Sequence, residues 1–427
     1  MKKRLIALLL AAVTAVSASA CSSPLENTET VTTPENSTIT ISTEGPVVTS
    51  TAESTAITSA IETTATSIAE GTTAASTTEN ITTTAVTTAG TTTVTTTTVA
   101  TTTAEITTAA TTTEITTTTS KPEEPATKSG LSNPNASPEA VRLYNFICDT
   151  YGKAIISGQQ ESTCMGSEQY EFDYIYNNTG KYPAIRGLDY MNDDFSGVNR
   201  RAKEWHDRGG IVTICWHCGY DFSGSWDECM KTERSDWDQA LTEGTAEYNK
   251  MIEQMDKAAK ALKELKDKNI AVLWRPFHEL DGGWFWWSKG GADRFKKLWQ
   301  IMYNRYTDYW ELDNLIWVLG YSGNGSGYDN WYPGDEYVDI AGADSYNEGA
   351  NQSLYTKVKN VVGSEMPVCF HECGRIPTVK QLQDAKAGWV WFMTWHTEYI
   401  TNSNSVGDLK SIYNDDYVIT LDELPPL

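Results

Sequence analysis

Residues 271–279 read AVLWRPFHE, and residues 280–287 continue as LDGGWFWW. The first stretch is an apolar run typical of a buried β-strand, and it ends in the carboxylate of Glu279. A second run, PVCFHECG at residues 367–374, contains the same His-Glu pair and ends near Glu372. In a parallel α/β barrel, the residues at the carboxyl ends of the strands meet at one rim. The two runs therefore predict two carboxylates on the same rim, beside a group of tryptophans.

Two carboxylates beside aromatic side chains suit the hydrolysis of a sugar polymer. One carboxylic acid can protonate the leaving oxygen while the other carboxylate attacks the ring carbon. Indole faces, such as those within residues 284–287, can stack on sugar rings. A single Glu at the end of a strand is more often solvated or paired with a cation. Because Glu279 and Glu372 occur in matching contexts, a catalytic pair is the favoured interpretation.

The apolar runs also predict the fold. Near-continuous apolar strands are expected where a parallel sheet is covered on both faces. Eight such runs occur, at residues 154–159, 182–189, 210–217, 270–279, 315–320, 338–346, 367–372 and 389–395. Apolar residues at helical spacing predict helices at residues 246–266, 292–309 and 352–362. Strands that alternate with helices over residues 134–427 predict a (β/α)8 TIM barrel, an α/β fold, with Glu279 after the fourth strand and Glu372 after the seventh.

The first 133 residues differ in character from this predicted domain. Residues 1–20 combine a basic start with a short apolar run, which predicts a secretory signal too short to cross a bilayer as a stable helix. Cleavage after Ala20 by an ordinary signal peptidase and lipid attachment at Cys21, with anchoring to a cell membrane, both fit this sequence. Residues 21–133 are rich in Thr, Ser and Glu and lack aromatic residues, which predicts a disordered stalk that holds an exported protein away from the cell envelope.

Composition excludes some partners and leaves others open. The formal net charge of −23 argues against nucleic-acid binding, which needs a basic face, and is compatible with a neutral polysaccharide. We expect a monomer without cofactors or metal ions. Cys215, His217 and Cys218 have the spacing of half a zinc site, but no second pair follows at a suitable distance. Disulfides and buried thiols both remain open for the eight cysteines, as does the linker's glycosylation.

The motifs resemble glycoside hydrolase family 26, which consists mostly of β-mannanases and belongs to a clan of retaining (β/α)8 glycosidases. Residues 275–287 carry the most specific resemblance, and residues 209–217 and 413–420 add to it. The resemblance covers the predicted barrel and none of the stalk. It implies that Glu279 is the general acid/base and that Glu372 is the nucleophile. It further implies that substrate is contacted or the nucleophile oriented by His217, His278, Trp284, Tyr346 and Trp395.

Two positions depart from the family pattern. Asp281 stands where many members have Asn, and His396 follows Trp395 where some have Arg. Both departures leave the preferred polysaccharide open. The first hypothesis is an exported endo-β-1,4-mannanase that retains configuration and cleaves mannan, galactomannan or glucomannan. The same fold and mechanism could instead act on mixed-linkage β-glucan or β-1,3-xylan.

Two hypotheses belong to other classes of protein. The first is a non-catalytic polysaccharide-binding protein at the cell surface, which the presence of both Glu residues in full motif context disfavours. The second is a metallohydrolase that uses the two His-Glu pairs. Neither pair has the second His of the His-Glu-x-x-His metal motif, which argues against that class.

Overall fold

The computed structural model describes residues 78–88, 91–101 and 130–427, so the predicted signal sequence and Cys21 lie outside the described residues. Within the predicted stalk, β1 (Thr78–Thr88) and β2 (Thr91–Thr101) pair as antiparallel strands, with Thr78 opposite Thr101. The disordered stalk expected over residues 21–133 stays a prediction. Most residues in β1 and β2 are Thr or Val, whose β-branched side chains favour an extended backbone.

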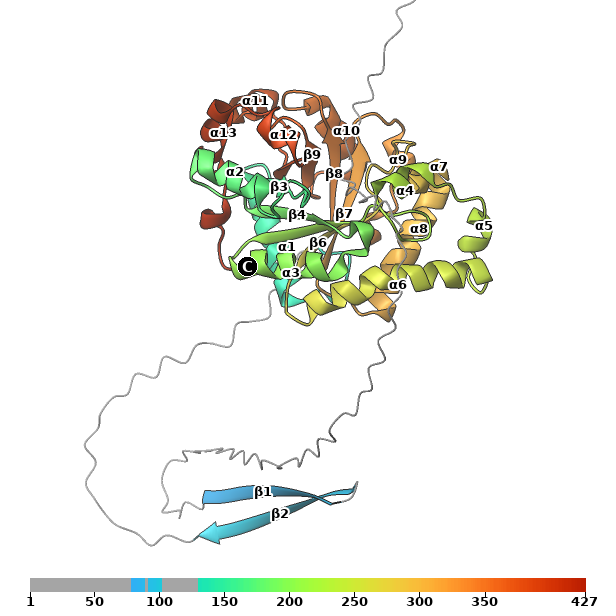
Figure 1. The fold of residues 1–427 in the computed structure, drawn as a ribbon, viewed down its shortest axis with the longest axis vertical. Helices are drawn as coiled ribbons and strands as arrows, with labels where there is room; N and C mark the ends of the chain where they lie inside the picture. Colours follow the sequence, from blue (N-terminus) through green and yellow to red (C-terminus); the bar gives the residue numbers. More distant parts are fainter. Residues whose placement is uncertain (1–77, 89–90, 102–129) are drawn as a thin grey trace, which may run out of the picture. The chain divides into compact units, whose positions relative to one another are not determined.

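Residues 130–427 contain a closed barrel of parallel strands surrounded by helices (Figure 1). Each strand pairs with the next in the sequence, and the last pairs with the first, with Trp391 opposite Ile156. This closure confirms the predicted TIM barrel. The barrel strands are β3 (Ile155–Gln160), β4 (Ile185–Asp189), β5 (Ile211–Cys215), β6 (Val272–Arg275), β7 (Leu315–Ser322), β8 (Ile340–Ser345), β9 (Val368–Cys373) and β10 (Trp391–Thr394).

The helices follow the predicted pattern closely. Two predicted helices have the predicted bounds, and the third divides into an α-helix and a π-helical turn at its carboxyl end. The longer helices are α1 (Pro138–Thr150), α2 (Tyr170–Thr179), α3 (Phe195–Asp207), α6 (Ala246–Lys266), α8 (Ala292–Asn304), α10 (Gln352–Val362), α11 (Val379–Ala385) and α13 (Val406–Tyr413). Short elements are η1 (Met191–Asp193), α4 (Trp226–Lys231), α5 (Trp237–Ala240), α7 (Trp286–Lys289), η2 (Arg305–Tyr309), α9 (Tyr328–Trp331), η3 (Asp335–Tyr337), α12 (Glu398–Thr401), β11 (Val418–Ile419) and η4 (Leu421–Glu423).

Local sequence explains where α6 begins and which face it buries. The hydroxyl of Thr245 accepts a hydrogen bond from the amide of Tyr248, which caps the helix. Met251, Met255 and Leu262 lie on its buried face, at spacings of about one or two turns. None of the helices within the described part of the chain is long and apolar enough to cross a membrane.

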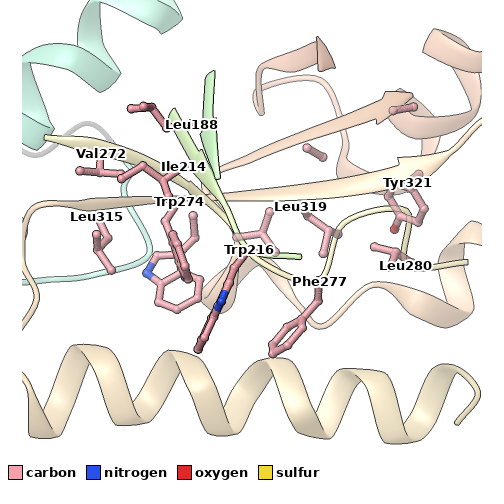
Figure 2. Close-up of a cluster of buried hydrophobic side chains, with 14 of the residues drawn as sticks. Leu188, Ile214, Trp216, Val272, Trp274, Phe277, Leu280, Leu315, Leu319 and Tyr321 are labelled. Atoms are coloured by element: carbon pink, nitrogen blue, oxygen red, sulfur yellow. The ribbon is translucent and has the colours of Figure 1, made fainter. Parts of the chain in front are cut away.

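Alternate residues of the barrel strands belong to two apolar clusters. The larger cluster lies between the strands and the outer helices, and Figure 2 shows part of it, with Val272 and Trp274 of β6. The smaller cluster fills the barrel interior and includes Leu273 of β6 together with Ile147 of α1. Successive side chains of a strand point to opposite faces, so Arg275 follows Leu273 into the interior. The carboxyl end of β6 therefore delivers a cation to the centre of the barrel.

Candidate active site

The turn after β6 places Glu279 at the rim of the barrel. Phe277 and Glu279 have φ angles of 51° and 50°, in the left-handed region that bulky residues rarely adopt. Backbone strain of this kind is concentrated at functional sites. The indole nitrogen of Trp287 donates to the carbonyl of His278 at 2.8 Å, and the amide of Leu280 donates to the carbonyl of Gly320 at 3.2 Å. These two bonds hold the turn in place.

A β-bulge in β9 turns Glu372 into the barrel. Ala343 and Asp344 of β8 pair with Phe370 and Glu372 of β9, so β9 has one extra residue, His371. The pairing with β10 shows the same irregularity. Phe370 belongs to the larger cluster, between the strands and the outer helices. Strict alternation along the strand would turn Glu372 outward as well. The extra residue reverses that direction, as bulges beside active sites commonly do.

Two groups fix the carboxylate of Glu372. Arg275 donates from Nη1 to Oε1 at 2.8 Å, and Tyr346 donates from its hydroxyl to Oε2 at 3.0 Å. The other terminal nitrogen of Arg275 donates to Asp344, so one guanidinium bridges two carboxylates. Charge-assisted bonds of this kind stabilise the ionised carboxylate and set its orientation. The predicted contact between Tyr346 and Glu372 is present.

The carboxyl group of Glu279 has different surroundings. Although the residue is partly exposed, protein surrounds the carboxyl group, and this burial together with the negative charge of Glu372 raises the pKa of Glu279 to about 8. Trp284 donates from its indole nitrogen to Oε2 at 2.7 Å, which opposes the rise. At neutral pH the carboxyl group of Glu279 is therefore mainly protonated.

The spacing of the carboxylates indicates the type of displacement that they can support. One oxygen each of Glu279, Asp344 and Glu372 lie within 4.8 Å of one another. Retention by double displacement uses carboxyl groups about 5–5.5 Å apart, whereas inversion needs about 6.5–9.5 Å to admit a water molecule. The arrangement fits retention.

Two histidines lie between Glu372 and Asp189, the last residue of β4. His217 bonds through Nδ1 to Oδ2 of Asp189 at 2.6 Å and through Nε2 to Nε2 of His278 at 3.0 Å. His278 Nε2 lies 3.7 Å from Oε1 of Glu372. Burial would lower the pKa of His217, but the charge of Asp189 raises it, whereas burial and the charge of Arg275 hold the pKa of His278 well below its usual value. When His217 is protonated, it can donate through Nε2 to His278.

A pocket of about 170 Å³ adjoins His217. His217, Trp395, His396 and Trp226 are among the residues that line it. The ring of Trp395 lies 6.2 Å from that of His217, and its amide donates to the carbonyl of Cys373 at 2.9 Å. Trp395 thus forms a wall of this pocket, and its contact with substrate stays a prediction.

The predicted site residues come together, and the structure adds three that sequence reasoning missed. Contacts around the two carboxyl groups join six of the predicted residues, namely Glu279, Glu372, His217, His278, Trp284 and Tyr346. The missed residues are Asp189, Arg275 and Asp344. Their signal was available, because each is a charged residue at or near the carboxyl end of an apolar strand. Trp286 and Trp287 are fully buried and belong to the core.

Two groups of side chains within residues 130–427 have the spacing of metal ligands. One is the carboxylate group of Glu279, Asp344 and Glu372, and the other consists of Asp189, Cys215 and His217. In the first group Arg275 already supplies a positive charge to two of the three carboxylates. In the second, His217 Nδ1 is engaged by Asp189. The absence of a metal site stays a prediction.

Cys215, Cys218 and His371 are further candidate metal ligands in the sequence. Cys215 and Cys218 are buried free thiols, and Cys218 belongs to neither group. His371 contacts the ring of Trp391 inside the barrel and is also outside both groups. The paired His-Glu arrangement of a metallohydrolase is therefore not formed by these described residues.

Comparison with known proteins identifies relatives of the described domain. Residues 132–423 match the family described as glycosyl hydrolase family 26. The mannan endo-1,4-beta-mannosidase of Thermothelomyces thermophilus is 36% identical over 324 residues, which are 71% of this chain and 64% of that protein. Mannan endo-1,4-beta-mannosidase B of Piromyces sp is 36% identical over 69% of this chain and 53% of that protein. The chain thus spans less than two thirds of the length of these two relatives.

Solved structures agree with this relationship. A ruminal family 26 endo-β-1,4-mannanase has a TM-score of 0.65 and 33% identity, covering 70% of this chain and 71% of that one. A β-mannanase from a symbiotic protist of the termite Reticulitermes speratus, complexed with gluco-manno-oligosaccharide, has a TM-score of 0.65 and 31% identity, covering 70% of this chain and 99% of that one. The match over residues 132–423 agrees with the strand order and the paired glutamates, and it shows that the chain belongs to glycosyl hydrolase family 26.

Proposed function

We propose that this protein is an endo-β-1,4-mannanase that hydrolyses mannan, galactomannan or glucomannan with retention of configuration. The observation that carries the proposal is the pair of Glu279 and Glu372, with oxygens within 4.8 Å and unlike surroundings. Family membership supports it, as do the names of the relatives from Thermothelomyces thermophilus and Piromyces sp. A linear polysaccharide would lie across the rim, with Trp284 and Trp395 beside the cleavage point.

In the first step, Glu372 attacks the anomeric carbon while Glu279 gives its proton to the leaving oxygen. Arg275 and Tyr346 orient Glu372 through their hydrogen bonds. The proton is available near neutral pH because burial and the charge of Glu372 keep it on Glu279. A covalent glycosyl ester of Glu372 and a shortened polymer result.

The second step uses the same two carboxyl groups, and Glu279 now accepts a proton instead of donating one. Once Glu372 has formed the ester its negative charge is gone, so one of the causes that raises the pKa of Glu279 disappears. Glu279, which has lost its proton, can then act as a base toward water. Water attacks the anomeric carbon, Glu372 leaves as carboxylate, and Glu279 regains its proton.

Release of reducing sugar from four polymers tests the proposal. The full chain should act on galactomannan and glucomannan, but not on lichenan or β-1,3-xylan. Activity confined to lichenan or β-1,3-xylan would retain the mechanism and overturn the substrate. Failure on all four would favour the polysaccharide-binding hypothesis instead.

Substitution of Glu279 separates catalysis from binding. Glu279→Ala should reduce hydrolysis of galactomannan by at least about a thousandfold while retaining affinity for the polymer, because general acid catalysis and the field at the site are both lost. Affinity electrophoresis in galactomannan gels provides the binding measurement. Unchanged turnover in this variant would contradict the role of Glu279.

We also propose that the protein is exported and that Cys21 carries a lipid that attaches it to a membrane. Support comes from the basic start and apolar run of residues 1–20. Fractionation of cells that express the full chain or Cys21→Ala tests this. The full chain should sediment with membranes and incorporate labelled fatty acid, whereas the variant should appear in the medium. Equal release of both would leave ordinary secretion as the answer.

A further inference from the structure

The turn that follows β10 has an unusual backbone at Thr397. Its φ and ψ angles are 54° and −124°, a combination that suits glycine and is strained for a β-branched residue. The two preceding residues, Trp395 and His396, both line the same pocket as His217. A change at Thr397 would therefore move two walls of that pocket. Some other group must hold this residue in its strained conformation.

That group is Glu171, near the start of α2. Its side chain is fully buried. Oε1 accepts a hydrogen bond from the amide of Thr397 at 2.9 Å, and Oε2 accepts one from the amide of Ser162 at 3.4 Å. No ion pair involves Glu171 within residues 130–427. A buried carboxylate without a cation is costly, and here the two amides satisfy it.

The two amides belong to the loops that follow the first and the last strand of the barrel, which pair with each other where the barrel closes. Ser162 follows β3, the first strand of the barrel, and Thr397 follows β10, the last. Ser162 lines the same pocket as Trp395. Glu171 therefore joins two walls of the pocket where the barrel closes.

Other bonds make the surroundings of Glu171 rigid. The hydroxyl of Tyr174, one turn along α2, donates to the carbonyl of Thr401 in α12 at 3.4 Å, and the two helices pack together. The side-chain amide of Gln159 in β3 donates to the carbonyl of Trp395 at 3.2 Å. The turn between Trp395 and α12 is thus fixed at both ends, and Glu171 binds the amide of its most strained residue, Thr397.

We infer that Glu171 is a positioning residue for substrate binding: it holds the strained turn at Thr397 and so sets Trp395 and His396 against the sugar. This inference rests on the proposed function of the pocket. Glu171 does not reach the reacting atoms, and it acts through the backbone of the turn. A purely structural role would make it important for stability alone.

Kinetics of Glu171→Gln in the full chain test the inference. Glutamine keeps the size of the side chain but offers only one acceptor oxygen, so one of the two amides faces an NH2 group. KM for glucomannan should rise about tenfold and kcat should change less than about twofold, since the lost binding is shared by ground state and transition state. The pH profile of kcat should not move, because Glu279 and Glu372 are untouched.

A second substitution makes the test independent of general destabilisation. Glycine tolerates the backbone angles of Thr397, so Thr397→Gly removes the strain that would drive the turn to relax. The rise in KM caused by Glu171→Gln should therefore fall to about twofold or less when it is measured in the Thr397→Gly background. An equal rise in both backgrounds would overturn the inference, as would an unchanged KM in Glu171→Gln.

Ile175→Val provides a matched control. Ile175 is fully buried on the same helix and does not touch the turn through any polar group. This variant should lower the melting temperature and leave KM unchanged. A rise in KM for Ile175→Val equal to that for Glu171→Gln would mean that any loosening of α2 has the effect, and would also overturn the inference. Hydrolysis of glucomannan by the unchanged chain shows separately whether the proposed function holds.

Discussion

Glu279 and Glu372 have the same side chain and lie close together, but their partners differ in charge. Glu372 accepts hydrogen bonds from Arg275 and Tyr346, and the bond from Arg275 is charge-assisted. Glu279 has no cation in direct contact among the described ion pairs, and its carboxyl group faces the charge of Glu372. Arg275 at the end of β6 thus pairs with Glu372, whereas burial and the charge of Glu372 raise the pKa of Glu279.

The first prediction concerns the alkaline limb of the pH–rate profile. Glu279 must be protonated to act as the acid, and its pKa is about 8, so kcat/KM should fall about tenfold per pH unit above that value. Trp284→Phe removes a bond that lowers this pKa. The limb should therefore move to higher pH in Trp284→Phe, whatever happens to the maximal rate. A limb that moves to lower pH would contradict this account of Glu279.

The second prediction concerns Asp189 and His217. His217 has a raised pKa when folded, so the pair stabilises the fold below about pH 6.5 and this contribution is lost as the pH rises through the raised pKa of His217. Asp189, whose pKa is lowered, stays ionised throughout this range. Asp189→Asn should therefore reduce the free energy of unfolding by about 2 kcal/mol near pH 5.5 and by less at pH 9.

Thermal melts between pH 5 and pH 9 measure this difference. Asp194→Asn is the control, because its partner Arg201 keeps its charge over the whole range. The loss of stability in that control should not depend on pH. A loss that is equally flat for Asp189→Asn would show that His217 is not charged. Activity of Asp189→Asn should also fall by at least about tenfold, since His217 loses the group that orients it.

At the scale of single elements, the sequence predicts strands better than it predicts side-chain directions. The apolar run at residues 367–372 identifies β9, because burial on both faces leaves a continuous apolar signal. The same run contains no mark of the bulge at His371, since an extra residue changes the direction of Glu372 and leaves the composition unchanged. Arg275 lay within the quoted motif, but its two carboxylate partners come from strands that are distant in sequence.

The third prediction tests the packing of β7 against the turn that follows β6. A Cβ added at Gly320 would lie 3.2 Å from both Nε of Arg275 and Cβ of His278. Gly320→Ala should therefore displace these two side chains by a few tenths of an ångström and lower kcat about 10- to 100-fold. Steady-state kinetics on glucomannan provide the measurement.

Gly388→Ala is the matched control for this clash. Its added Cβ would also lie 3.2 Å from a neighbour, the hydroxyl of Tyr355, which is not part of the site. Both variants should lose a similar, small amount of stability, and only Gly320→Ala should lose activity. Full activity in Gly320→Ala would show that Arg275 can move without consequence.

At the scale of the whole molecule, the described domain contains all the residues assigned to the site. Residues 132–423 match the family, and β3 to β10 close the barrel within them. The order of the apolar runs, with helices expected after three of the eight, is enough to predict this closure, because parallel strands require such crossovers. The hairpin of β1 and β2 was not predicted, since Thr-rich sequence favours an extended backbone without offering an apolar core.

The fourth prediction follows from the location of all the assigned site residues within residues 130–427. A chain that begins at Gly130 should have the same kcat and KM on soluble glucomannan as the full chain, within about twofold, because the site residues lie in residues 130–427. Kinetics of both chains at equal concentrations measure this. A large loss of activity in the shorter chain would assign a part of the site to residues before Gly130.

The hydrogen bond between Trp284 and Glu279 has a stereochemical consequence. The indole donates to Oε2, and the carbonyl oxygen of a carboxylic acid is a better acceptor than its hydroxyl oxygen, so this bond favours the acidic hydrogen on Oε1. The two oxygens of the carboxyl group are thereby made inequivalent before any sugar arrives. In the proposed mechanism, the glycosidic oxygen would then receive its proton from Oε1. Trp284, which the sequence suggests as a surface for sugar stacking, would thus also select the oxygen that gives the proton.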